Sequence, residues 1–332
     1  MLEIKTFKMM RSNRGNDISK FGSKYIYICK LKNHQAQTFM NLLIYLLSLP
    51  LIYFIALLPF RLLYVFSDIL SFVLYRIIGY RKKVVRDNLI RTGFGENETQ
   101  RLAIEKAVYK HFCDLYLETL KSLLLTKSQI QRRFVVKNSS LLQSYALQGK
   151  SVIMMCGHYA SYEWLLSMGY YSDHTAYGIY APLSNPYFDQ LIIRVRKRYG
   201  AYLIPRRETV KSIKHHVESN HLGLYGFASD QSPQIRKKTY FRKFFGTEVP
   251  VFTGAERIAK EHDIPVLMAK VRRVKRGFYK TEITVLANEP RKTEENYITD
   301  KFTEELEILI KEDPKYYLWT HNRFKRMHTK SD

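Results

Sequence analysis

The 332-residue sequence contains only three cysteines, Cys29, Cys113 and Cys156, and they lie far apart. An odd number without a CxxC spacing indicates neither a disulfide framework nor a cysteine-based metal site, so a reducing cytosolic setting is the simpler interpretation. The sequence also lacks a GxSxG segment, the turn that presents the catalytic serine of many hydrolases. No internal repeat or low-complexity tract is present. Any chemistry must therefore come from other residue types.

Acidic residues are scarce relative to basic ones. The chain has 54 Lys and Arg but 30 Asp and Glu, which gives a formal net charge of +24. Such a surplus predicts acidic partners: nucleic acid, an anionic membrane surface, a phosphorylated substrate or an acidic carrier protein. Hydrophobic residues make up 46% of the chain, with 25 Tyr and 19 Phe, so a disordered chain is excluded.

Charged side chains are missing altogether from Asn33 to Phe60. Within this stretch, Leu42–Phe60 is apolar and long enough to cross a hydrocarbon layer of about 30 Å as a helix. Pro50 and Pro59 predict a kinked or re-entrant helix. The next segment, Leu62–Tyr80, is typical of an amphipathic interfacial helix. A pair of buried core helices is the alternative interpretation.

We therefore expect three regions in the chain. Residues 1–39 are basic and without clear periodicity, which predicts a poorly ordered extension, and translation from either Met1 or Met40 fits the sequence. Residues 40–80 form the membrane anchor and interfacial helix. Residues 81–332 form the folded domain. A basic segment at its start, Gly79–Phe94, here called the basic collar, is suited to anionic lipid headgroups.

From Ser151 onward, short apolar runs alternate with helical stretches, which predicts an α/β fold with a mainly parallel sheet flanked by helices. The expected strands are Ser151–Cys156, Thr175–Ala181, Tyr202–Pro205, Leu222–Ala228, Pro265–Val271 and Tyr279–Leu286. The expected helices are Ser161–Tyr170, Pro186–Tyr199, Thr209–Ser219, Thr253–His262 and Asn296–Glu312. In such sheets, active groups gather at the carboxyl ends of the strands.

The segment "GHYASYEW" (Gly157–Trp164) follows the first of these strands and contains His158 and Glu163. The spacing alone occurs roughly once by chance in such a chain, but here it falls on a strand-to-helix junction. A carboxylate on one imidazole nitrogen leaves the other free as a general base. Without a serine, the nucleophile would be a substrate hydroxyl. The alternative is that His158 is a structural histidine. Cys156 ends a buried strand, so we expect it to be a core residue and not a nucleophile.

The same segment resembles the HX4(D/E) motif of the lysophospholipid acyltransferase superfamily. From about Asn41 to Lys325 the chain is similar to the HtrB-like late acyltransferases of lipid A biosynthesis. The blocks that carry this resemblance are "GYRKKVVRDNL", "YAPLSNPYFDQLIIRVRKRYGA", "FASDQSP", "FFGTEVPVFTGAERIAKEHDIPVLMAKVRR" and "YLWTHNRFK". The resemblance implies a glycerolipid-acyltransferase-like fold for residues 81–332.

It also implies transfer of an acyl chain from acyl carrier protein to a hydroxyl of a phosphorylated lipid A precursor, with the catalytic domain at the cytoplasmic face of the inner membrane. His158 would be the general base and Glu163 its partner, with no acyl-enzyme, metal or cofactor. Backbone N–H groups near Gly157 are the expected oxyanion donors. The expected substrate-binding residues are Asp230, Gln231, Asn185, Arg196 and Arg323.

Many members of that family read Tyr-Arg-Pro where this chain has Ala181 between Tyr180 and Pro182. The missing arginine leaves four candidates to replace it: Arg194, Arg196, Arg206 and Arg207.

Two other functions fit the sequence. One is acyl transfer from acyl-CoA, or to a phospholipid or another glycolipid. The other is a membrane-tethered binding module without a reaction. The mixed basic and aromatic segment Gln234–Gly246 suits single-stranded nucleic acid or a headgroup interface. The apolar N-terminal segment favours the membrane, so nucleic acid is not an expected partner.

Overall fold

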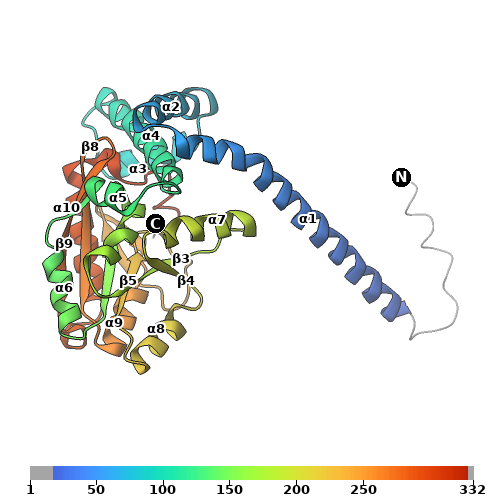
Figure 1. The fold of residues 1–332 in the computed structure, drawn as a ribbon. Coiled ribbons are helices and arrows are strands. Elements are labelled where there is room, and N and C mark those ends of the chain that lie inside the picture. Colours follow the sequence, from blue (N-terminus) through green and yellow to red (C-terminus); the bar gives the residue numbers. More distant parts are fainter. Residues whose placement is uncertain (1–17, 328–332) are drawn as a thin grey trace, which may run out of the picture.

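The computed structural model describes residues 18–327, and the side chains from residue 37 onward. Its centre is a seven-stranded sheet with the strand order β1-β9-β8-β2-β5-β3-β4 (Figure 1). The strands are β1 (Phe134–Val136), β2 (Val152–Cys156), β3 (Thr175–Tyr180), β4 (Ala201–Pro205), β5 (Gly223–Ala228), β8 (Val266–Lys275) and β9 (Phe278–Ala287). Most neighbours are parallel, but β8 and β9 form an antiparallel pair. The predicted fold class, a mainly parallel sheet flanked by helices, is confirmed.

Helices connect and cover these strands. They are α3 (Lys82–Arg91), α4 (Glu98–Lys121), α5 (Lys127–Arg133), α6 (Ser139–Leu147), α7 (Pro186–Lys197), α8 (Thr209–Glu218), α9 (Gly254–His262) and α10 (Tyr297–Glu312). α10 packs on β8 and β9, and α9 packs on β2. All six predicted strands are present within a few residues of the expected bounds. One predicted helix, Ser161–Tyr170, is instead the 3-10 helix η3 (Tyr162–Tyr171).

The basic and aromatic segment Gln234–Gly246 contains a strand that the sequence did not predict. β6 (Phe241–Phe244) pairs with β7 (Thr247–Pro250) in an antiparallel hairpin. Phe245 and Gly246 both have positive φ, the backbone conformation of a tight hairpin turn. Phe244 is fully buried, and Arg242 forms ion pairs with Asp300 and Glu304 of α10. At least part of this segment therefore belongs to the packed domain.

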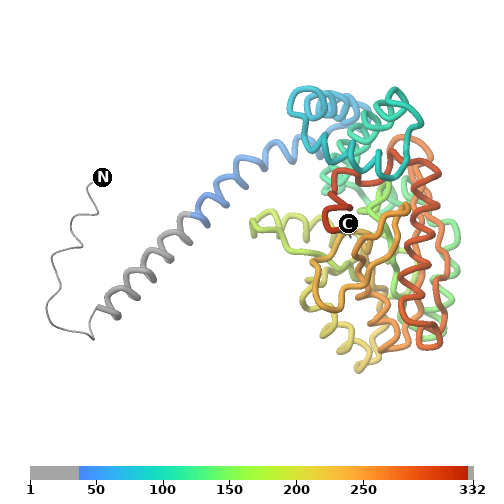
Figure 2. The backbone as a smooth tube through the Cα atoms, turned by 180° about the vertical axis from the view of Figure 1, so that it is seen from behind, coloured from blue at the N-terminus to red at the C-terminus, as the bar shows by residue number. Residues whose placement is uncertain are grey.

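Helix α1 (Ile18–Leu57) projects away from the sheet domain (Figures 1 and 2). Its stretch Gln37–Leu57 is long and apolar enough to cross a membrane, with a mean hydropathy of 2.1, and only 17% of its most apolar window is buried. The helix starts at Ile18, so residues 18–39 are helical and not the predicted poorly ordered extension. Residues 1–17 of that extension lie outside the described part of the chain.

The predicted interfacial segment folds as α2 (Phe60–Phe72) and the π-helix η2 (Val73–Ile78). One face of α2 packs on α4, where Ser67 donates a hydrogen bond to the buried Asp114 carboxylate at 2.7 Å. The opposite face exposes a stripe at helical spacing: Leu62, Val65, Ile69 and Phe72. The expected amphipathic helix is therefore present.

Ion pairs fix α2 against the sheet domain. Arg276, in the turn between β8 and β9, binds the carboxylates of Asp68 at 2.7 Å and Asp114 at 2.6 Å. Asp114 is fully buried and also binds Arg273, so two arginines together balance this buried charge. The apolar stripe of α2 is thus held in a fixed orientation relative to the sheet.

The C-terminal segment closes the carboxyl-end edge of the sheet. Tyr317 forms an isolated antiparallel bridge with Tyr159, just beyond β2. The backbone N–H of Leu318 donates to the carbonyl of His158 at 3.1 Å, and that of Ala160 donates to the carbonyl of Tyr316 at 2.9 Å. Backbone hydrogen bonds to the C-terminal segment therefore hold the loop at His158 and at Ala160.

Candidate active site

His158 lies at the carboxyl end of β2, in the middle of the sheet. Gly157 precedes it and passes close to α10: a Cβ at this position would lie 2.5 Å from Leu306 Cδ1. Ala160 follows with φ of 49°, a left-handed conformation that non-glycine residues rarely adopt. Such strained loops cluster at functional sites because the surrounding contacts hold them in place.

The imidazole of His158 is bonded to Asp230, which follows the neighbouring strand β5. Asp230 Oδ1 lies 2.6 Å from His158 Nδ1, and Asp230 Oδ2 accepts the backbone N–H of His158 at 2.9 Å. The carboxylate is 4% exposed. Because Nδ1 then carries the proton, Nε2 keeps its lone pair, and the side-chain amide nitrogen of Gln231 lies 3.2 Å from it.

Electrostatics favour the protonated imidazole at this position. Burial alone lowers the pKa of His158, but the charge and hydrogen bond of Asp230 outweigh it and raise the pKa above the ordinary value, and the charge of Glu163 adds to this. Burial likewise acts to raise the pKa of Asp230, but the charge and hydrogen bonds of His158 hold that pKa below its ordinary range. The pair can therefore accept a proton at Nε2 and stabilise the cation that results.

The sequence analysis predicted Glu163 as the carboxylate partner of His158, and this prediction is wrong. Glu163 forms a two-point ion pair with Arg196 of α7, at 2.8 Å (Nη2–Oε1) and 3.1 Å (Nε–Oε2). The reason lies in strand register: Cys156 pairs with Ala228, so His158 and Asp230 each lie two residues past a matched pair of strand ends. Asp230 thus faces the imidazole directly, whereas Glu163 starts a separate 3-10 helix.

Asn185 and Arg323 have structural contacts in place of an open binding face. Asn185 caps α7 by accepting the backbone N–H of Tyr187 at 3.0 Å, and its amide donates to the carbonyl of Asn41 on α1 at 3.1 Å. Arg323 is 2% exposed and donates to Ser232 Oγ and the Pro250 carbonyl, both at 3.0 Å. Arg323 thus supports the loop after Gln231, and its expected phosphate contact stays a prediction.

The expected oxyanion donors near Gly157 are occupied. The backbone N–H of His158 donates to Asp230, that of Tyr159 to the carbonyl of Gly157, and that of Ala160 to the carbonyl of Tyr316. The donors for an oxyanion would therefore come from side chains. The Gln231 amide and the Arg196 guanidinium both lie near His158; Arg196 is close enough for its charge to act on the imidazole.

Two further aromatic groups of the site were not predicted. The ring of Tyr162 lies edge-on to the His158 ring, with centroids 4.7 Å apart. His321, in the block "YLWTHNRFK", has a pKa lowered to about 4, because burial outweighs the nearby Asp230 and because Arg323, His158 and Arg81 oppose its charge. In the sequence, His321 could be associated with the site only because the block that contains it resembles the family.

The arrangement contains a base and its orienting carboxylate but no protein nucleophile among the neighbouring side chains described. Cys156 is buried, and burial strongly raises the pKa of its thiol. Within the described part of the chain, no group of three or more His, Cys, Asp or Glu side chains has the geometry to hold a metal ion. The site can therefore activate a hydroxyl that a substrate brings to Nε2.

Comparison with known proteins identifies similar chains. Residues 33–326 match the family model described as bacterial lipid A biosynthesis acyltransferase. A curated protein of Haemophilus influenzae, named lipid A biosynthesis acyltransferase, is 25% identical over 203 residues. That alignment covers 58% of this chain and 60% of the curated protein, so the chain spans about three fifths of the relative's length. The family match includes every candidate site residue described above.

Proposed function

This chain belongs to the bacterial lipid A biosynthesis acyltransferase family, and from that premise we propose that it transfers a fatty acyl group to a hydroxyl of a lipid A precursor. The observation that carries the proposal is the bond between the partly exposed His158 ring and the buried Asp230 carboxylate, at the carboxyl ends of two adjacent parallel strands. Nε2 of that imidazole is the proton acceptor that an alcohol nucleophile requires.

The reaction proceeds by direct transfer. Nε2 of His158 takes the proton of the acceptor hydroxyl as its oxygen attacks the thioester carbonyl carbon of the donor. Asp230 stabilises the imidazolium that forms. The tetrahedral intermediate then collapses, the C–S bond breaks, and the imidazolium returns the proton to the leaving thiolate. No acyl-enzyme is needed, because the thioester already has a good leaving group and the nearest thiol, Cys156, is buried.

Arg196 is our candidate for the arginine that the family has where this chain has Ala181. Its pKa is raised, because the charge and hydrogen bonds of Glu163 outweigh burial. The Arg196 side chain is 20% exposed, and Glu163 holds its Nε and Nη2 atoms. A fixed cation near the imidazole suits either the developing oxyanion or a phosphate of the acceptor.

A charge-neutral change of Glu163 separates this positioning role from that of a catalytic partner. We expect Glu163→Gln to lower kcat/KM by about tenfold, since Gln removes one charge-assisted hydrogen bond with Arg196 but leaves the His158 pair intact. Arg196→Lys, which cannot make the two-point contact, should have a similar effect. The measurement is steady-state kinetics with both substrates. A loss from Glu163→Gln as large as from a change of His158 would contradict this assignment.

Contact with the membrane is supported by the exposed apolar residues of α1 and α2. We propose that α1 anchors the protein in the inner membrane and that the α2 stripe lies at the interface, with the catalytic domain facing the cytoplasm. The basic collar just after η2 then lies where anionic headgroups are available. The anchor places a soluble donor and a membrane-embedded acceptor within reach of one site.

Acyl carrier protein is the proposed donor. The formal charge of +24 favours an acidic carrier and a phosphorylated acceptor together. We expect purified enzyme to acylate a lipid A precursor from acyl carrier protein with a kcat/KM at least about tenfold higher than from acyl-CoA, and the advantage should shrink as salt rises.

Mass spectrometry of the product reports the acyl chain and the acylated hydroxyl in the same experiment. Phosphatidic acid and lysophospholipid serve as competing acceptors. Acylation of a phospholipid in preference to the lipid A precursor, or equal use of both donors at low salt, would refute the corresponding half of the proposal.

A further inference from the structure

Helix α7 lies beside the apolar part of α1, and the two helices run in the same direction toward the sheet domain (Figures 1 and 2). Tyr187, in the first turn of α7, stacks on Tyr45 of α1 with ring centroids 5.7 Å apart. Val195, near the other end of α7, shares an apolar cluster with Ala56. The contact residues on α1 recur at helical spacing: Asn41, Tyr45, Ile52 and Ala56. Helix α7 therefore follows α1 over most of its own length.

The start of α7 lies at the level of the stretch of α1 that we propose as the membrane anchor. The side-chain amide of Asn185 donates a hydrogen bond to the carbonyl of Asn41 at 3.1 Å. Asn41 and Tyr45 both belong to Gln37–Leu57, the stretch that is long and apolar enough to cross a membrane. A lipid layer that surrounds this part of α1 therefore also meets the start of α7.

The chain that leads into α7 has the composition of a segment in contact with lipid. From Thr175 to Phe188 it contains no Asp, Glu, Lys or Arg, although the protein has a formal net charge of +24. Leu183 is 48% exposed, and its neighbour Pro182 is exposed as well. Basic residues occupy four of five positions at the other end of α7: Arg194, Arg196, Lys197 and Arg198. Apolar residues followed by cations match the order of hydrocarbon and headgroups in one leaflet.

Several polar groups of this segment are bonded within the segment itself. The backbone N–H of Leu183 donates to the carboxylate of Asp189 at 2.9 Å, and the hydroxyl of Tyr180 donates to the same carboxylate at 3.3 Å. The backbone N–H of Tyr187 donates to Asn185 Oδ1 at 3.0 Å. The two prolines of the segment have no N–H at all. Internal pairing of this kind is what a loop requires in an environment without water.

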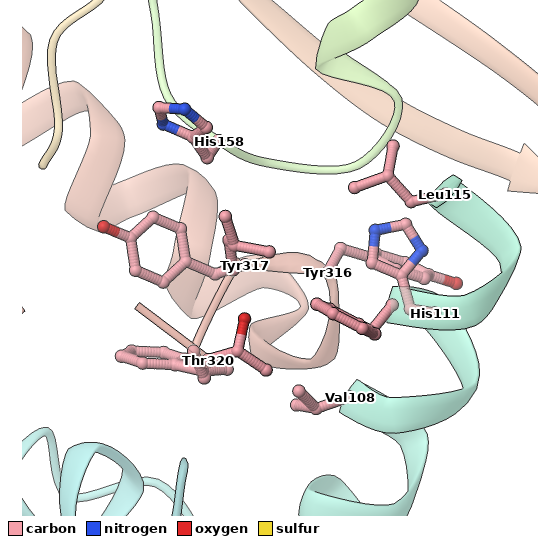
Figure 3. Close-up of a pocket in the computed structure, with 10 residues that line it drawn as sticks. Val108, His111, Leu115, His158, Tyr316, Tyr317 and Thr320 are labelled. Carbon is pink, nitrogen blue, oxygen red and sulfur yellow. The ribbon is translucent and has the colours of Figure 1, made fainter. Parts of the chain in front are cut away.

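One side of His158 is closed to a lipid chain. His111 and Leu115 of α4 line one wall of the space there, and Tyr316 and Tyr317 of the C-terminal segment line the other (Figure 3). This space has room for about one water molecule, so an acyl chain does not fit. A lipid substrate must therefore reach His158 from another side.

We infer that the end of α7 that projects from the domain, Ala181–Phe188, inserts into the apolar layer of the membrane beside α1. We call this segment the α7 tip. The inference rests on the proposed anchoring by α1 and deepens it, because the membrane contact then includes the helix that carries Arg196. Arg196 lies about 12 Å along the helix from Phe188. A membrane-bound acceptor thus reaches Arg196, and His158 near it, without leaving the lipid surface.

The first test places one additional tryptophan in the full-length protein, bound to vesicles of phosphatidylethanolamine and phosphatidylglycerol with brominated acyl chains. Trp164 and Trp319 are both fully buried, so they do not report contact with lipid. We expect the bromine to quench Leu183→Trp on the α7 tip and Phe54→Trp on α1, but not Leu147→Trp. Leu147 is 78% exposed, but it ends α6 shortly before β2 begins, at the edge of the sheet opposite the site.

The three positions separate failure of this inference from failure of the proposed anchoring. Quenching of Phe54→Trp without quenching of Leu183→Trp would overturn the inference and leave the anchor in place. Quenching at neither position would remove the anchor, and the inference with it. Equal quenching of Leu147→Trp would indicate unspecific adsorption to lipid and would also overturn the inference. None of these results depends on acyl transfer, so the test stands even if the proposed reaction fails.

A kinetic test asks whether the insertion serves the reaction. Leu183→Glu should raise the KM for a lipid A precursor in vesicles by about tenfold with kcat little changed, because a carboxylate is unfavourable in the apolar layer. Leu183→Met keeps the side chain apolar and should keep the KM. Leu147→Glu is the matched control on the far edge of the sheet and should change neither constant. A KM of Leu183→Glu equal to that of the natural enzyme would contradict the inference.

Discussion

Replacing His158 with Gln should lower the rate of acyl transfer by about 10²–10⁴-fold, the range that a positioned general base contributes. Gln is similar in size and remains neutral, but it cannot take a proton from the acceptor hydroxyl. Its side chain still reaches Asp230, which at present accepts the imidazole Nδ1–H at 2.6 Å, so the loop should keep its conformation. The measurement is kcat with saturating donor and acceptor, together with the thermal unfolding midpoint.

The matched control is His174→Gln, at a histidine that is more buried than His158 and whose ring is bonded to residues outside the site. Its ring is bonded to Ser172 and to the Lys150 carbonyl, so the control removes buried hydrogen bonds without touching the reaction. If His158→Gln retains a rate within a factor of a few of the natural enzyme, His158 is not the base and the mechanism fails. A common loss in both variants would indicate a folding defect.

The sequence predicted the sheet because its central strands are short, continuous apolar runs, typical of strands that are buried on both faces. Every residue of β2 is buried, for example, and its bounds were nearly correct. β1 was missed, since three residues carry no periodicity, and β6 was missed because Arg242 and Lys243 interrupt its apolar residues. Long-range pairing, not local composition, makes both of these strands.

The sequence predicted where the site lies, but not which side chains are bonded to each other. His158 and Asp230 lie just past the expected strands Ser151–Cys156 and Leu222–Ala228, whose bounds the apolar runs define. Their contact depends on β2 lying beside β5 with Cys156 opposite Ala228, a register that no local pattern encodes. Glu163 was favoured because it is near in sequence. Its partner, Arg196, lies on a helix 33 residues further along the chain, beyond what spacing can predict.

Replacing Asp230 with Asn should lower kcat by about 10³–10⁴-fold, comparable to the effect of the same change on the His–Asp pair of a serine protease. The backbone N–H of His158 donates to this side chain at 2.9 Å, so the amide oxygen of Asn must face it. The amide NH2 then points at Nδ1, which has to accept. The proton moves to Nε2, and the base is blocked although the ring stays in place.

The pH profile gives an independent reading of the same change. Transfer needs neutral His158, and the pKa of His158 lies above its ordinary value because Asp230 outweighs burial. In the natural enzyme, kcat/KM should therefore fall as the pH drops through a value above about 6.5. In Asp230→Asn, burial is no longer opposed by a carboxylate at this position, so the acid limb of the remaining activity should move to lower pH.

These two results together decide between the two carboxylates of the site. Glu163 also contributes to the raised pKa of His158, so Glu163→Gln should move the acid limb in the same direction but by less, and with a much smaller loss of kcat. Asp230 holds the imidazole by a hydrogen bond to the ring, whereas Glu163 acts only through its charge and through Arg196. Asp230→Asn with a rate near that of the natural enzyme, beside a severe loss in Glu163→Gln, would reverse the assignment and return the orienting role to the HX4E acid.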